Sequence, residues 1–292
     1  MSKPLPFASV EDLRASFREE AYLADRSLAT AVYLAVSLDK PLLLEGEAGV
    51  GKTEVAKALA ATLGRNLIRL QCYEGIDASQ ALYEWNYSRQ LIAVRALQDS
   101  QAEASVEDLF GEDFLVERPL LAALRAGVRA VLLVDELDRA DDEFEAFLLE
   151  VLSEFAVTVP EIGRIAAPHP PAVVITSNRT RELHDALKRR CLYHWIEHPG
   201  LEREVAIVRT RAPEVSEALT RQVVTLVQQL RTRSDLVTPP GGAETLDWAR
   251  ALERLGTEKL DVEAAATTLG TVVKYREDAE RVRAALDRML TG

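Results

Sequence analysis

The stretch Gly46-Glu-Ala-Gly-Val-Gly51-Lys52-Thr53 has the spacing G-x4-G-K-[ST] of a phosphate-binding loop. An apolar run, Leu42–Glu45, precedes it, and a stretch rich in Ala, Lys and Leu, Thr53–Leu63, follows it. These flanks predict a buried strand before the loop and a helix after it. Glycines let backbone N–H groups curve around phosphate oxygens, and the start of the helix adds partial positive charge. The stretch therefore favours an α/β nucleotide-binding fold over a glycine turn that merely starts a helix.

The loop predicts ATP and Mg²⁺ as cofactors. We expect Lys52 to neutralise charge on the β- and γ-phosphates and Thr53 to offer its hydroxyl to Mg²⁺. The predicted nucleotide-binding residues form one continuous run: Gly46, Glu47, Ala48, Gly49, Val50, Gly51, Lys52, Thr53 and Glu54.

A second apolar run, Ala130-Val-Leu-Leu-Val-Asp135, ends in an acid and is followed by another, Glu136. Ligands of open α/β sheets bind at the carboxyl ends of the strands, and burial of this strand brings both acids there. We expect Asp135 to hold Mg²⁺, and Glu136 to position and polarise the attacking water as a general base. More acids follow at Asp138, Asp141 and Asp142, so a surface turn rich in acids is the alternative interpretation.

Two polar groups follow further along the chain. Thr176-Ser177-Asn178 ends another apolar strand, where Asn178 can hydrogen-bond the γ-phosphate or the attacking water, or can simply cap a helix. Lys188-Arg189-Arg190 follows a short helix. A guanidinium at a subunit edge can reach a neighbour's γ-phosphate, whereas a solvated basic helix end explains the charge more simply. The residues alone leave both questions open.

The amino-acid composition limits the kinds of partner and binding site that we expect. Lys and Arg total 35 and Asp and Glu total 47, so the formal charge is −12. Such a surface repels nucleic acid and anionic lipid at long range, so nucleic acid is not an expected partner. The two cysteines exclude a disulfide framework and a cysteine-rich zinc site. No apolar run approaches the ~18 residues of a membrane span, and no signal peptide is recognisable, so we expect a cytoplasmic protein.

The roles of an aromatic cluster and of a histidine pair are not decided by the sequence. Tyr73, Tyr83, Trp85 and Tyr87 can form a protein-contact surface or local packing, or a platform on which single-stranded nucleic acid stacks. His194 and His198 have a spacing that metal ligands can use, but no carboxylate or cysteine completes a tetrahedral set. A core strand explains this histidine pair more simply.

The chain alternates strands and helices to about residue 198 and reads as helices alone after Pro199. We therefore expect a nucleotide-binding domain at 1–198 and a helical domain at 199–292. Within the first domain, residues 71–95 read as an inserted loop or hairpin leading into a helix, and residues 157–165 read as a small hairpin.

Taken together, these motifs resemble AAA+ ATPases, and more closely the MoxR family. The CoxD-like branch of that family is suggested by four stretches, which are Leu70–Gly75, Ala81–Tyr87, Arg189–Trp195 and Pro239–Trp248. That branch is associated with maturation of the molybdenum–copper carbon monoxide dehydrogenase. The resemblance runs from about Ala21 to Leu255. It implies a P-loop NTPase fold, with a five-stranded parallel sheet, helices on both faces and a small all-α lid domain.

The resemblance also implies roles and partners. Asn178 takes the sensor-1 role, and Arg190, with Arg189 close behind, takes that of the arginine finger. The implied assembly is a homo-oligomer, a hexameric ring, that hydrolyses ATP to remodel a client metalloenzyme. A protein with a von Willebrand A domain is the implied partner. The chain departs from the family at Gly242-Ala-Glu244-Thr, where many relatives place a sensor-2 arginine.

Two rival functions remain at this point. A nucleic-acid motor would use the same ATPase parts, although the acidic balance argues against it. A nucleotide-gated scaffold that seldom hydrolyses ATP would explain the missing lid arginine. A small-molecule kinase fits the acid pair and the helical domain less well, and a GTPase is disfavoured because no N-K-x-D stretch is present.

Overall fold

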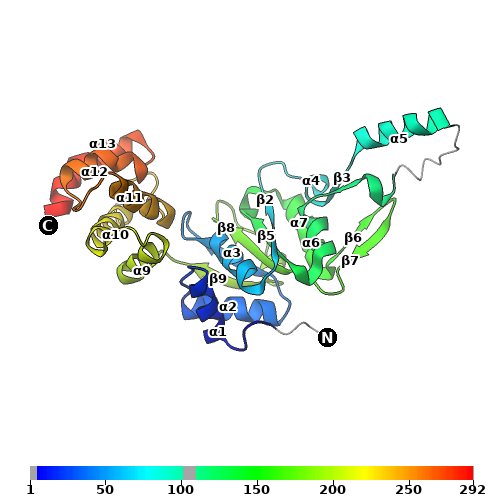
Figure 1. Ribbon diagram of the computed structural model, residues 1–292, viewed down its shortest axis with the longest axis horizontal. Coiled ribbons are helices and arrows are strands. Elements are labelled where there is room, and N and C mark those ends of the chain that lie inside the picture. The colour runs from blue at the N-terminus through cyan, green and yellow to red at the C-terminus, as the bar shows by residue number, and fades with distance from the viewer. Residues whose placement is uncertain (1–4, 101–109, 292) are drawn as a thin grey trace. The chain divides into compact units, whose positions relative to one another are not determined.

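A computed structural model describes residues 5–100 and 110–291 (Figure 1). The chain forms two compact units. Unit 1 comprises the residues up to Glu20, Ala24–Glu45 and Thr53–Trp195. Unit 2 comprises Ala21–Leu23, Gly46–Lys52 and the chain from Ile196 onward.

The centre of unit 1 is a five-stranded sheet with the order β2-β5-β8-β1-β9. Its strands are β1 (Leu42–Gly46), β2 (Asn66–Gln71), β5 (Ala130–Asp135), β8 (Ala172–Ser177) and β9 (Leu192–Ile196). The pairs β2–β5, β5–β8 and β8–β1 are parallel. Each central strand is a short, continuous apolar run, because a parallel sheet covered by helices is buried on both faces.

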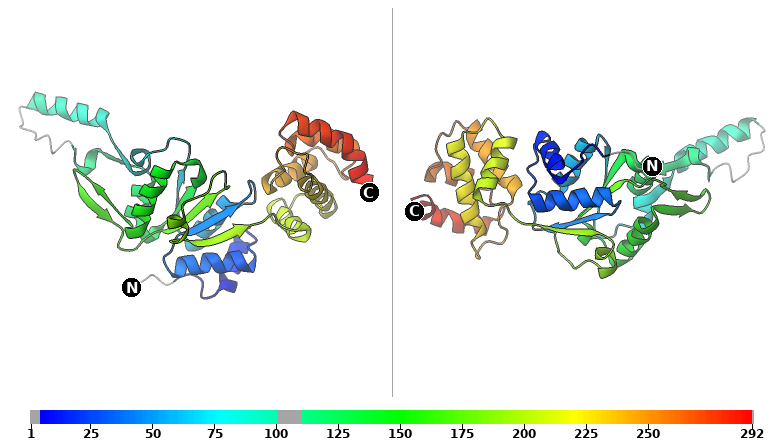
Figure 2. Two further views of the ribbon diagram at one scale, coloured as in Figure 1. Left: turned by 180° about the vertical axis from the view of Figure 1, so that it is seen from behind. Right: turned by 90° about the horizontal axis from the view of Figure 1, so that it is seen from below.

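Helices cover both faces of this sheet (Figures 1 and 2). Leu132 and Val134 of β5 belong to one core cluster with residues of α6 and α7, while the buried Val131 and Leu133 alternate to the opposite face. The helices of unit 1 are α1 (Val10–Glu19), α2 (Arg26–Ser37), α3 (Lys52–Leu63), α4 (Ala78–Leu82), α5 (Tyr87–Ser100), α6 (Pro119–Ala126), α7 (Asp142–Glu154) and α8 (Asp185–Lys188). The predicted fold class is confirmed.

Two small antiparallel pairs complete unit 1. β3 (Tyr83–Trp85) pairs with β4 (Leu115–Glu117), and β6 (Ala156–Val159) pairs with β7 (Gly163–Ala166). The stretch expected to be an inserted loop or hairpin therefore contains α4 and β3. The following helix, α5, begins at Tyr87, where the Asn86 side chain accepts a hydrogen bond from the backbone N–H of Arg89.

Unit 2 contains an all-helical bundle. Its helices are α9 (Leu201–Arg211), α10 (Glu217–Arg231), α11 (Gly242–Arg254), α12 (Val262–Thr268) and α13 (Arg276–Thr291). They enclose an apolar core that includes the fully buried Trp248. Inside it, the carboxylate of Glu204 accepts hydrogen bonds from Arg231 Nη1 at 2.6 Å and from Thr245 Oγ1 at 2.9 Å. A buried charge of this kind is tolerated because it is paired and hydrogen-bonded.

Within residues 5–100 and 110–291, no helix has both the length and the apolar character that crossing a bilayer requires.

Candidate functional site

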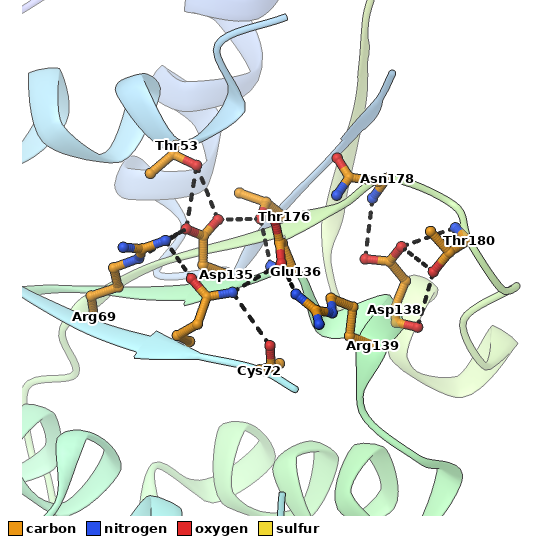
Figure 3. Close-up of polar contacts among 11 residues, drawn as sticks. Thr53, Arg69, Cys72, Asp135, Glu136, Asp138, Arg139, Thr176, Asn178 and Thr180 are labelled. Carbon is orange, nitrogen blue, oxygen red and sulfur yellow. Dashed lines mark hydrogen bonds and ion pairs between the residues drawn. The ribbon is translucent and has the colours of Figure 1, made fainter. Parts of the chain in front are cut away.

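Asp135 is the centre of a polar cluster at the carboxyl ends of β5 and β8 (Figure 3). Its carboxylate is buried, and Thr53 Oγ1 donates a hydrogen bond to Oδ1 at 3.0 Å. Thr176 Oγ1 donates to the same oxygen at 2.6 Å, and the Arg69 guanidinium pairs with Oδ2 at 2.6 Å. The parallel sheet creates this cluster, because it brings the ends of strands far apart in sequence to one edge.

The oxygen atoms of Thr53 and Asp135 are suitable ligands for a magnesium ion. Mg²⁺ prefers oxygen ligands, and protein sites for it commonly use one or two carboxylates together with substrate phosphates. Thr53 and Asp135 supply a hydroxyl and a carboxylate that already contact each other. In the described parts of the chain, no cluster of three or more His, Cys, Asp or Glu residues is arranged to hold a metal by itself.

Glu136 follows directly and is held by three contacts. Its backbone N–H donates to Thr176 Oγ1 at 2.9 Å. Its Oε2 accepts hydrogen bonds from Gln71 Nε2 and from Arg139 Nη1, both at 3.0 Å. With a φ of +56°, Glu136 has the left-handed conformation, which costs a non-glycine residue roughly 1–2 kcal/mol. The turn leads the chain out of the strand and leaves the Glu136 carboxylate between two side-chain donors.

The residues around Glu136 were not assigned a role from the sequence. Gln71 ends β2, and its Cα is paired with that of Asp135 at the end of β5. Arg69 lies two residues earlier and therefore on the same face of the strand. The signal that could have found them is the register of β2 against β5, which the motifs do not reveal.

Both cysteine thiols have a raised pKa. Burial, together with the nearby carboxylates of Asp135, Asp138 and Glu136, raises the pKa of the Cys72 thiol to about 12. Burial alone raises the pKa of Cys191 to about 12. Because the thiolate is the nucleophilic form, both side chains act as small apolar groups at neutral pH.

Asn178 follows β8 beside Asp138. Its backbone N–H donates to Asp138 Oδ1 at 3.1 Å, while Thr180 N donates to Oδ2 at 2.9 Å (Figure 3). The next helix, α8, begins only at Asp185, with His184 at its N-cap, so Asn178 is not at a helix start. Its side-chain amide makes no hydrogen bond with any residue in the described ranges.

The two candidate finger arginines lie after α8 and are exposed. Arg190 Nη1 donates to Ser153 Oγ of α7 at 2.6 Å. Among the residues that the structure describes, no contact joins Arg189 or Arg190 to Asp135 or Glu136. The structure thus keeps both arginines apart from the cluster that α3, β5 and β8 form in the same chain.

The loop Gly46–Lys52 belongs to unit 2. The buried Lys52 ammonium donates to the carbonyl oxygens of Gly46 at 2.8 Å and Glu47 at 2.6 Å. Glu47 also contacts His198, with 3.0 Å between Oε2 and Nε2. Burial and Arg231 lower the pKa of His198 below its ordinary value, while Glu47 offsets part of that shift, so the imidazole is neutral at pH 7. Glu54 in α3 accepts a hydrogen bond from Lys57 Nζ at 2.6 Å.

The start of α11 lies against this loop within unit 2. The backbone N–H of Gly242 donates to Gly49 O at 3.0 Å. A Cβ on Gly49 would lie 2.8 Å from Gly241 Cα, and Gly49 also has a φ of +79°. Glu244 Oε2 accepts from Gly241 N at 3.1 Å. The position expected for a lid arginine therefore carries a carboxylate that caps its own helix.

Comparisons with known proteins indicate the family to which the chain belongs. A family model described as "AAA domain (dynein-related subfamily)" matches residues 41–191, slightly more than half of the chain. A gas vesicle ATPase of Halobacterium salinarum is 24% identical over 271 residues, covering 87% of this chain and 75% of the relative. A gas vesicle ATPase of Haloferax mediterranei is 27% identical over 210 residues, covering 69% of this chain and 59% of the relative.

A solved structure shares the fold. The chain matches a point mutant of RuvB from Thermotoga maritima with a TM-score of 0.50 and 14% identity, covering 92% of this chain and 73% of RuvB. At that identity the likeness concerns the fold alone.

Proposed function

This chain belongs to the AAA domain family, in the dynein-related subfamily, and we propose that it couples ATP hydrolysis to the remodelling of a client protein in the manner of MoxR ATPases. The predicted enzyme class, an AAA+ P-loop ATPase, is confirmed. The observation that carries the proposal is the hydrogen bond between Thr53 and Asp135, with Lys52 before the one and Glu136 after the other.

The proposed mechanism is largely electrostatic. Backbone N–H groups of Gly46–Lys52 surround the triphosphate, and Lys52 exchanges its two carbonyl acceptors for phosphate oxygens. Thr53 and Asp135 would hold Mg²⁺, which neutralises charge that develops on the transferring phosphoryl group. Lys52, which directly precedes Thr53 in the chain, adds a buried positive charge. Electrostatic stabilisation by a buried charge is stronger than in water.

Glu136 acts on the attacking water. Gln71 and Arg139 fix the orientation of its carboxylate, so that the water is aligned rather than freely tumbling. General-base catalysis of this kind contributes roughly 10²–10⁴ in rate. Asn178 is proposed to hydrogen-bond the γ-phosphate or the same water.

The assembly, the client and the partner are proposed from the resemblance of the sequence to the MoxR family. We infer a homo-oligomeric ring, a hexamer, in which Arg190 of one subunit serves the site of the next. The client is a metalloenzyme, with a von Willebrand A domain protein as partner, as in the CoxD-like branch. The cytoplasm remains the predicted location. The names of the gas vesicle relatives support the ATPase activity alone.

Replacing Glu136 by Gln tests the proposal. The variant should bind ATP with unchanged affinity, because the amide keeps the size of the side chain, and should lose about 10²–10⁴ in single-turnover rate, because no base remains. Wild-type binding with wild-type turnover would contradict the role of Glu136. Failure of the variant to bind ATP would mean that Glu136 holds the nucleotide instead.

A scaffold that seldom hydrolyses ATP is the second candidate, because Glu244 places a negative charge at the lid position beside Gly49. Single-turnover hydrolysis by the assembled protein, with and without a partner, separates the two. A rate that stays at the level of Glu136→Gln under both conditions favours the scaffold.

A further inference from the structure

A cavity lies in unit 1 at the amino ends of β1 and β8, whereas Asp135 lies at the carboxyl end of β5. It is lined by the C-terminal half of α2, the first residues of β1 and β8, part of α3 and the segment that precedes β8. Leu42 and Ala172, which line it, are the first residues of β1 and β8. A strand of this length spans about 17 Å at 3.3 Å per residue, so the cavity is separate from the cluster at the carboxyl ends.

Part of the cavity wall is apolar. Buried side chains of Val32, Val36, Leu42, Leu59 and Val173 line it. The volume is about 210 Å³. Since one water occupies about 30 Å³ in the liquid, the space equals roughly seven waters, which suits a small molecule and not a peptide helix.

Arg65 places a positive charge at the cavity wall. Arg65 lines the cavity directly after Gly64, the residue that follows α3, and is half-buried. Within residues 5–100 and 110–291, its guanidinium makes no hydrogen bond and no ion pair. Burial lowers the pKa of Arg65 below its ordinary value, and the charge of Asp39 offsets only part of that effect. A guanidinium nevertheless stays charged in proteins, so its N–H donors have no protein acceptor among the described residues.

Four other polar side chains line the wall; two of them are basic, and the other two are Ser37 and Asp39. Lys40 and His169 line the cavity with Arg65, and Asp39 is the acid among them. This local balance contrasts with the formal charge of −12 for the whole chain. An anion would satisfy the Arg65 donors, and an apolar body would replace water along the valine and leucine side chains.

We propose that this cavity binds a small amphiphilic monocarboxylate, with its carboxylate paired with Arg65 and its hydrocarbon body against Val32, Val36 and Leu59. The Arg65 guanidinium can pair with one carboxylate, because its fork geometry matches both carboxylate oxygens. The proposal does not depend on ATP binding, because the two sites share none of the residues named here.

Calorimetric titration of the full chain with octanoate tests this proposal, with octanol and acetate as matched probes that lack the charge or the apolar body. Octanoate should bind one per chain. Octanol should bind at least about tenfold more weakly, since a hydrogen bond to a charged group is worth about that factor. Acetate should also bind at least about tenfold more weakly, because it lacks CH₂ groups whose burial is worth about 0.8 kcal/mol each. Equal binding of octanol would overturn the role of Arg65, and equal binding of acetate would overturn the role of the apolar wall.

Three variants locate the site. Arg65→Gln should weaken octanoate binding about tenfold or more, as expected for a lost charged hydrogen bond. Ala35→Leu, which adds bulk to the wall, should also weaken it. Arg164→Gln removes an exposed arginine of the same unit and should change nothing. Thermal unfolding of each variant shows that it is folded. Octanoate affinity that is equal in Arg65→Gln and wild type would overturn the proposal, as would binding that survives in Ala35→Leu.

Discussion

Asp135 illustrates how single residues prepare the proposed magnesium site. The carboxylate is 2% exposed, and two hydroxyls and one guanidinium hydrogen-bond it. A buried carboxylate needs such partners, because an unpaired charge is costly to remove from water. Of these three partners, Arg69 can leave the carboxylate most easily, because its side chain is 52% exposed. Thr53 and Thr176 are held in place by α3 and β8. We therefore propose that Arg69 is a counterion that Mg²⁺ would replace.

Replacing Arg69 by Ala should lower the stability of the fold and raise the affinity for Mg·ATP. The free energy of unfolding should fall by about 1–2 kcal/mol, a buried-pair loss reduced by the exposure of Arg69. Affinity for Mg·ATP should rise, because the carboxylate no longer has a competing cation. Urea unfolding and nucleotide titrations with and without Mg²⁺ measure the two effects.

Arg164→Ala provides the control, because its ion pair with Glu154 is exposed on both sides. It should alter neither property by a measurable amount. If Arg69→Ala instead weakened Mg·ATP binding at unchanged stability, Arg69 would be a nucleotide-binding residue and not a counterion.

At the scale of elements, the loop Gly46–Lys52 and the first turn of α11 form one packed backbone contact within unit 2. Gly49 and Gly241 approach so closely that neither leaves room for a Cβ. The hydrogen bond from Gly242 N to Gly49 O and the contact between His198 and Glu47 add to it. Helix α11 thus contacts the loop through backbone atoms, where the family motif would place an arginine side chain.

Gly241→Ala should disturb this contact. The new Cβ would lie 2.7 Å from Gly49 Cα, so the loop or the helix must shift. We expect ATP affinity to fall about tenfold, a loss of about 1.4 kcal/mol, because the phosphate-binding N–H groups are displaced. Thermal unfolding should show that the variant is folded.

Gly270→Ala is the matched control, since nothing lies within 4 Å of the Cβ it would introduce. ATP affinity should stay at the wild-type value in that variant. An unchanged affinity in Gly241→Ala as well would show that the contact has no influence on the loop.

Most elements could be predicted from the sequence, because their local signals are strong. β1, β5 and β8 are short apolar runs, and α7 begins where the Asp141 side chain accepts from Phe144 N at 2.8 Å. The β3–β4 pair could not be predicted, since its strands have three residues each and are distant in sequence. Arg69 and Gln71 were missed for a related reason: their contacts depend on the register of two strands that are not consecutive.

At the scale of the whole molecule, the exposed Arg190 belongs to the proposed ring. Its contact with Ser153 places it on the surface formed by α7 and α8. If it serves a neighbouring subunit, then each complete site contains residues from two copies, as a head-to-tail ring requires.

Arg190→Ala should bind ATP normally and lose about 10³–10⁵ in turnover, the usual value of a finger arginine. Arg189→Ala should lose less. Mixing equal amounts of Arg190→Ala and Glu136→Gln, both inactive alone, should restore activity at about a quarter of the sites, because some interfaces then combine intact residues from both copies. A mixture that stays inactive, although it assembles, would place Arg190 in the site of its own chain.

The central claim is that Lys52, Thr53 and Asp135 together hold the triphosphate and its magnesium ion. Calorimetric titration of ATP, with and without Mg²⁺, tests it most directly in wild type, Lys52→Ala and the exposed-lysine control Lys259→Ala. We predict magnesium-dependent binding in wild type and the control, and a loss of about 10- to 100-fold in Lys52→Ala, the worth of a charge-assisted hydrogen bond. Folded wild-type protein without magnesium-dependent affinity, or equal affinity in Lys52→Ala, would contradict the account.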